Sequence, residues 1–113
     1  MKIDLTVKFL GLDDEPIKDE KGKEMTMYDI LRIASVTEVK GDTDGSDAIE
    51  RRMKNYDIFL NVKNAGPACK EYEISAEEIV HIKARIGQVF STLICGPAVK
   101  ILEGKPPYGS VVH

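Results

Sequence analysis

The chain has 113 residues, which is enough for one domain around one hydrophobic core. Its 16 basic and 19 acidic side chains give a formal charge of −3 at pH 7, and no clustered basic face is present to bind nucleic acid. The longest apolar run, residues 92–103, contains Lys100 and Glu103 and falls short of the roughly 20 residues that a membrane span requires.

The N-terminal residues lack the central hydrophobic block and the small-residue cleavage site of a secretory signal. We therefore expect a cytoplasmic protein. The two cysteines, Cys69 and Cys95, lie far apart and form no Cys-x-x-Cys motif. In a chain without an export signal, this usage favours two reduced, partly buried thiols.

Residues 2–9 alternate between apolar and polar side chains, which is typical of a half-buried strand. The apolar positions are Ile3, Leu5, Val7 and Phe9. A strand needs a partner for its backbone groups, and the sequence offers two candidates. One is a short hairpin within residues 16–25, and the other is the alternating segment 69–74.

A helix is predicted over residues 26–36, because Thr26 is a good N-cap and Asp29 stands three residues later, as in a capping box. A polar loop follows, containing Gly41, Gly45 and three aspartates. We expect this loop to be mobile.

A second helix is predicted over residues 47–63, with Ser46 as its N-cap and Gly66-Pro67 beyond its end. Its apolar side chains recur at helical spacing and are expected to face the core. They are Ile49, Met53, Tyr56 and Leu60, with Phe59 widening the stripe.

The capping box Ser75-Ala76-Glu77-Glu78 begins a third predicted helix, over residues 76–90. Its apolar face contains Ile79, Ile82, Ile86, Val89 and Phe90. Gly87 lies inside this helix, where glycine costs about 1 kcal/mol relative to alanine. A close crossing with another backbone would account for a glycine at this position.

A fourth helix is predicted over residues 97–103, because Gly96-Pro97 suits a helix start. Residues 105–113 are expected to form a loosely ordered tail after a single compact domain, residues 1–104. The predicted fold is α+β and mainly helical. Three to four helices pack on a short two-stranded antiparallel sheet or hairpin.

No phosphate-binding loop, dinucleotide motif or zinc-protease motif is present. We expect no catalytic residue, no metal site and no cofactor. The alternative is a small metal- or thiol-dependent enzyme that uses His81 with Cys95 or Glu77, or with Cys69. Glu77 and His81 share a helix face, and Cys95 lies just before a predicted helix start, a position that favours a reactive thiol.

Several segments resemble small proteins encoded by tailed bacteriophages and prophages. The stronger match is C-terminal, in Ser75–Ile79, Ile82-Lys83, Ile86-Gly87 and Leu102–Gly104, and the polar stretch Glu15–Lys23 matches near the N-terminus. The resemblance covers most of residues 1–104, whereas Leu93–Gly96 and residues 105–113 depart from it. These proteins have no assigned activity, so the resemblance implies an origin and a size class but no functional residue.

The function expected from the sequence is therefore a non-catalytic protein-interaction protein of phage or prophage type. Its partner would be a host or a phage protein, which corresponds to a host-takeover inhibitor or an assembly factor. The candidate interaction surface consists of apolar residues left over from the core, namely Phe59, Val62, Val111 and Val112. The edge of segment 2–9 is a second candidate, and self-association as a homodimer is one use of such surfaces.

Overall fold

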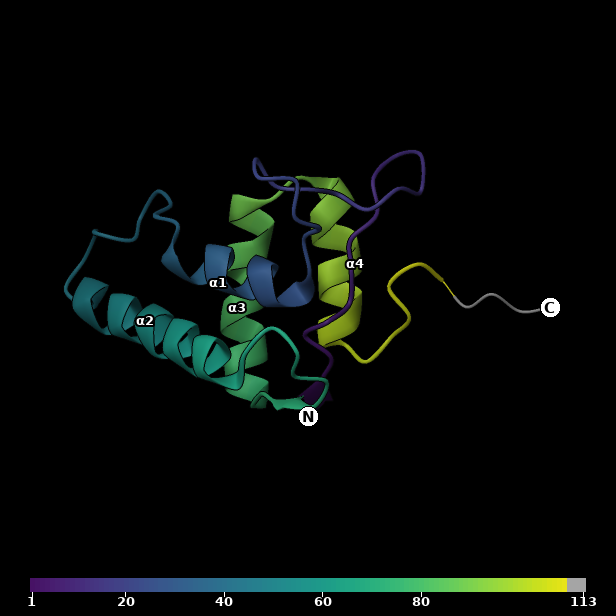
Figure 1. The fold of residues 1–113 in the computed structure, drawn as a ribbon. Helices are drawn as coiled ribbons and strands as arrows, with labels where there is room; N and C mark the ends of the chain where they lie inside the picture. The colour runs from purple at the N-terminus through teal and green to yellow at the C-terminus, as the bar shows by residue number, and fades with distance from the viewer. Residues whose placement is uncertain (110–113) are drawn as a thin grey trace.

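The structure is a computed structural model that describes residues 1–109. Within these residues it has four helices and a two-stranded antiparallel sheet, so the mainly helical α+β prediction is confirmed (Figure 1). In chain order the elements are β1 (Lys2–Ile3), α1 (Met27–Val36), α2 (Ala48–Ala65), β2 (Tyr72–Glu73), α3 (Ala76–Val89) and α4 (Thr92–Leu102).

Helix α1 is central: it packs against α2 on one side and α3 on the other, and α4 packs against α3. Its start is capped as expected, since the Thr26 backbone N–H donates to Asp29 Oδ2 at 3.0 Å. Its core-facing side chains Ile30, Leu31 and Ala34 are fully buried. No described helix combines the length and apolar character needed to cross a membrane.

Strand β1 is only two residues long, although residues 2–9 keep their alternating burial. Ile3 pairs with Tyr72, and Ile3, Leu5 and Phe9 are all buried. The ladder ends where the Asp4 carboxylate accepts the Thr6 backbone N–H at 2.8 Å, a local turn that competes with strand pairing.

Both predicted partners of segment 2–9 are used, at different places. Its start pairs with β2, while Phe9 donates to the Met25 carbonyl at 3.2 Å and accepts from the Ile17 N–H at 2.8 Å. Residues 16–25 thus fold back beside Phe9, with one bridge between Lys18 and Glu24. Tyr108, within the predicted tail, accepts the Leu10 N–H on its hydroxyl at 2.7 Å.

The predicted buried stripe of α2 is wrong. Ile49, Met53 and Tyr56 are 69%, 52% and 51% exposed. The inward positions are instead Asn55, Ile58 and Val62. The helix also begins one residue later than predicted, with Asp47 rather than Ser46 at the N-cap position. Polar contacts described below hold α2 in this orientation.

Helix α3 begins as predicted. The Glu78 N–H donates to Ser75 Oγ at 3.1 Å, and the Ser75 N–H donates to Glu78 Oε1 at 3.0 Å, which completes the capping box. Ile82 and Ile86 are fully buried on its inner face.

Helix α4 begins at Thr92, five residues before its predicted start, and Pro97 lies inside it. The Ser91 carbonyl accepts from the Cys95 N–H at 2.8 Å and so forms the first turn. The prediction that Pro97 starts this helix is wrong: the preceding turn packs Ile94 and Cys95 against the core, which offsets the loss of one backbone hydrogen bond at the proline.

The predicted close crossing at Gly87 is also wrong. Gly87 is exposed, and no heavy atom lies within 4 Å of the place that a Cβ would occupy. Its backbone has helical geometry inside α3. Glycine here has only its entropic cost.

We predict that Gly87→Ala raises the free energy of unfolding by about 1 kcal/mol, because alanine restricts the unfolded chain and fits the helix. Urea denaturation followed by circular dichroism measures this change. Gly66→Ala is the matched control: Gly66 has φ = 88°, so alanine there should destabilise the protein. A loss of stability in Gly87→Ala would contradict the assigned helix geometry.

Candidate functional site

The most buried charged group is Arg85, on α3, which is 5% exposed. Its Nε donates to the Ala34 carbonyl at 2.7 Å and its Nη2 to the Thr37 carbonyl at 2.5 Å. These carbonyls belong to the end of α1, whose last turn has no intrahelical donors. Arg85 Nη1 also donates to Asp42 Oδ1 at 3.0 Å. One side chain thus joins α3, the end of α1 and the following loop.

Asp42 completes this cluster from the loop between α1 and α2. Its Oδ2 accepts the Val39 N–H at 2.8 Å, and the Arg85 hydrogen bond holds the pKa of Asp42 below its usual value despite burial. Arg51 of α2 donates to the Gly41 and Asp44 carbonyls at 2.7 and 2.6 Å. Two arginines therefore anchor the loop that was expected to be mobile.

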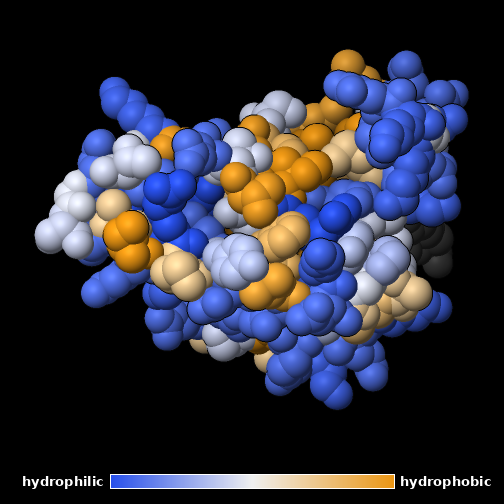
Figure 2. All heavy atoms as spheres, turned by 60° about the vertical axis from the view of Figure 1, so that its left-hand side comes forward, coloured by the Kyte–Doolittle hydropathy of each residue, from blue (hydrophilic) through white to orange (hydrophobic). Residues whose placement is uncertain are grey.

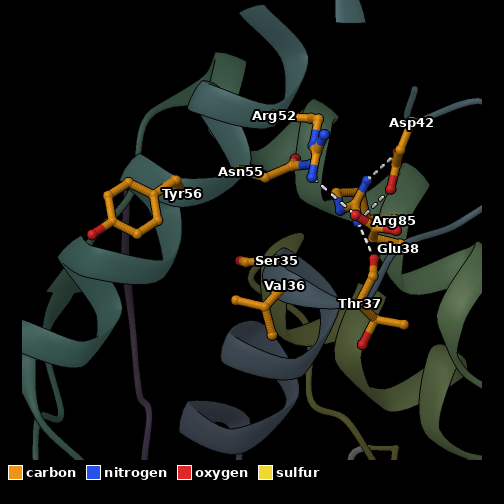
Figure 3. Close-up of a pocket in the computed structure, with 9 residues that line it drawn as sticks. All are labelled: Ser35, Val36, Thr37, Glu38, Asp42, Arg52, Asn55, Tyr56 and Arg85. Atoms are coloured by element: carbon orange, nitrogen blue, oxygen red, sulfur yellow. Dashed lines mark hydrogen bonds and ion pairs between the residues drawn. The ribbon is translucent and has the colours of Figure 1, made fainter. Parts of the chain in front are cut away.

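A cavity of about 200 Å³ lies beside this cluster (Figure 3). Its lining comes from the end of α1, the following loop, α2 and α3: Ser35, Val36, Thr37, Glu38, Asp42, Arg52, Asn55, Tyr56 and Arg85. The charges in the lining are already paired, Arg85 with Asp42 and Arg52 with Glu38 at 2.9 Å. The charged side chains of the lining thus bind one another across the cavity.

We predict that Arg85→Met lowers the free energy of unfolding by about 3 kcal/mol or more, because it leaves Asp42 buried without its cation. Urea denaturation at neutral pH tests this. Arg52→Met is the matched control in the same cavity. Its ion pair with Glu38 is exposed, so the expected loss is under about 1 kcal/mol. Equal losses would show that the Arg85 cluster does not hold the helices together.

The structure places the candidate catalytic groups with separate partners. His81 Nε2 lies 2.6 Å from Asn55 Oδ1 on α2, and Glu77 pairs with Lys54 of α2 at 3.0 Å. Burial lowers the pKa of His81, and the positive charges of Lys54 and Arg85 lower it further. His81 and Glu77 share a face of α3, and both connect that helix to α2.

The cysteines are not brought into a reactive arrangement with these groups. Cys95 lies within α4 rather than before a helix start, and both Cys69 and Cys95 are free thiols packed partly against the hydrophobic core. Within residues 1–109, no three His, Cys, Asp or Glu side chains gather closely enough to hold a metal ion.

The lowered pKa of His81 predicts a pH dependence of stability. In the unfolded chain His81 binds a proton near pH 6.5, whereas in the folded protein His81 binds the proton only at lower pH. The contribution of His81 to the free energy of unfolding is therefore fully present above about pH 6.5 and is lost as the pH falls through its folded-state pKa. Urea denaturation at about pH 7.5 and pH 5.5 should show a smaller decrease for His81→Gln than for the original chain. Equal decreases in the free energy of unfolding for the two chains would contradict the lowered pKa of His81.

An exposed apolar face runs along α2. Ile49, Met53, Tyr56 and Leu60 are spaced by four, three and four residues, as in the seam of a coiled coil, and the first three are more than half exposed. Figure 2 shows this side of the molecule, where hydrophobic atoms reach the surface in several places among hydrophilic ones. We call these four residues the outward face of α2.

The predicted interaction surface is corrected in part. Val62 is fully buried, because it lies on the inward side of α2 with Ile58. Phe59 is half-buried beside the outward face, with its ring centroid 6.4 Å from that of Tyr56. Val111 and Val112 lie outside the described residues.

The predicted free edge of segment 2–9 is wrong as well, because the chain itself occupies it. The Leu5 N–H donates to the Cys69 carbonyl at 2.9 Å, and the Leu5 and Val7 carbonyls accept from Tyr28 and Met27 at 3.0 and 2.9 Å. These hydrogen bonds leave little backbone there for another chain to pair with.

A groove of about 590 Å³ lies between the outward face of α2 and the start of α3, and we call it the α2–α3 groove. Ile49, Met53 and Ile58 supply its apolar lining. The polar lining contains four carboxylates and one cation: Glu50, Asp57, Glu77, Glu78 and Lys54, together with Asn61. The groove is thus apolar in part and acidic at its sides.

Two signals in the sequence point to these features. Arg85 falls three residues after Ile82 and four before Val89, so it lies on the apolar stripe, which indicates a buried arginine. Ile58 and Val62 form a second helical stripe on α2 beside the one chosen. Comparison of the chain with models of protein families, with curated proteins and with solved structures finds no match in any of the three.

Proposed function

We propose that this chain is a non-catalytic protein-interaction protein of phage or prophage type, which binds a host or phage protein through the outward face of α2. The observation that supports this is the exposure of Ile49, Met53 and Tyr56 along one helix. Single exposed apolar residues are common on proteins, but a row at coiled-coil spacing is typical of a helix that packs against a partner.

The energetics favour a partner on this face. Covering exposed apolar surface contributes roughly 25 cal/mol per Å², and Ile49, Met53 and Tyr56 are large side chains. Tyrosine and methionine are also enriched in interface cores, where Tyr56 would bury its ring and keep its hydroxyl near water.

The alternative function, a metal- or thiol-dependent enzyme, has less support from the geometry. His81 is bonded to Asn55, Glu77 is paired with Lys54, and Cys95 lies against the hydrophobic core. A nucleophile needs a base within hydrogen-bond reach, and His81 is directed to α2 instead.

The test is site-specific photo-cross-linking. A photoreactive amino acid at Met53 should cross-link a single host or phage protein in lysates of uninfected or phage-infected bacteria, with the product identified by mass spectrometry. The matched control carries the photoreactive amino acid at Val80, an exposed apolar residue on α3 that does not line the groove. Equal cross-linking at both positions, or none at Met53, would contradict the proposed surface.

The same experiment separates the two roles. A host enzyme cross-linked at Met53 supports an inhibitor, and a phage structural protein supports an assembly factor. A cross-link between two copies of the chain would show instead that the outward face of α2 forms a homodimer.

A further inference from the structure

We propose that the α2–α3 groove binds a positively charged amphipathic helix of the partner protein. The proposal rests on the proposed function, because it assigns a chemistry to the partner that covers the outward face of α2. It depends on two properties of the groove, its apolar lining and its excess of carboxylates.

The exposed part of the apolar lining, Ile49 and Met53, lies one helical turn apart on α2. Ile58 stands nine residues after Ile49, about 13 Å further along the helix axis, and completes the lining as a buried side chain that is 1% exposed. A helix lying in such a groove contacts it with apolar residues at positions i, i+3 or i+4, and i+7. The volume of about 590 Å³ is sufficient for several such side chains.

The charged residues around the lining indicate that the partner helix is positively charged. Lys54, the cation in the groove, is already paired with Glu77 at 3.0 Å. Glu78 accepts the Ser75 N–H in the capping box. Glu50 and Asp57 are exposed and form no ion pair with residues 1–109, and they stand seven residues apart on one side of α2. A helix with Lys or Arg at matching spacing would neutralise both.

A second copy of the chain fits this groove less well. In an antiparallel pair of α2 helices, the edge with Glu50 and Asp57 would face the same acidic edge of its copy. In a parallel pair, the facing cation would be Arg52, which is already bound to Glu38 at 2.9 Å. Charge complementarity therefore favours a different, cationic partner over self-association.

The test uses two synthetic helical peptides as probes, each about three heptads long. Both carry leucine at the a and d positions, one with lysine and the other with glutamate at the flanking positions. Fluorescence anisotropy should show saturable binding of the lysine peptide that weakens as salt is added, and no binding of the glutamate peptide. Amide shifts in NMR spectra should change along α2 and at the start of α3.

Matched variants separate groove binding from general attraction to an acidic protein. Met53→Lys in the groove should lower the affinity for the lysine peptide by about tenfold or more. Val80→Lys changes the net charge equally at an exposed apolar site on α3 that does not line the groove, and should leave affinity nearly unchanged. Glu50→Lys combined with Asp57→Lys keeps the apolar lining and should also weaken binding.

Equal effects of Met53→Lys and Val80→Lys, equal binding of both peptides, or a dimer of the free chain that Met53→Lys dissociates would overturn the proposal. The proposed function fails separately, when no protein cross-links at Met53. A partner that cross-links there but is unaffected by Glu50→Lys with Asp57→Lys would retain the function and overturn its cationic chemistry.

Discussion

The buried contact between Arg85 and Asp42 is the interaction on which the arrangement of helices depends. Arg85 extends from α3 and donates hydrogen bonds to the end of α1 and to Asp42 of the following loop, and its side chain is almost entirely buried. A buried ion pair adds little net stability compared with an apolar pair, but breaking it leaves an unpaired charge inside the protein. The contact therefore opposes any arrangement that separates α3 from the end of α1 and from the loop that leads to α2.

The same network determines which side of α2 meets solvent. Arg51 binds the anchored loop, and Asn55 and Lys54 contact His81 and Glu77 of α3. These contacts turn Ile58 and Val62 inward and leave Ile49, Met53 and Tyr56 outside. His81 and Glu77, which the sequence presents as a candidate catalytic pair, thus hold α2 against α3 beside the groove. Polar contacts in the interior and the proposed binding surface are parts of one arrangement.

The elements that could be predicted from the sequence are those with local signals. Two capping boxes mark the starts of α1 and α3, because the groups that satisfy the first backbone donors lie within three residues. The predictions are wrong where a distant contact or a competing local hydrogen bond outweighs the local pattern. Asp4 ends β1 after two residues by accepting a hydrogen bond from Thr6, and the packing of Ile94 and Cys95 against the core extends α4 to the N-terminal side of Pro97. Ile49 and Met53, which line the groove, belong to the stripe that the sequence pattern predicts to face the core.

The sequence by itself determined the helical segments, the alternating burial of residues 2–9 and the mainly helical α+β class, since these follow from spacing and caps along the chain. Only the tertiary structure decided which of the two apolar stripes of α2 is buried. Both stripes have helical spacing, so periodicity cannot distinguish them. The choice depends on partners far along the chain, such as Asn55 with His81 and Arg85 with Asp42, which meet only when the helices pack.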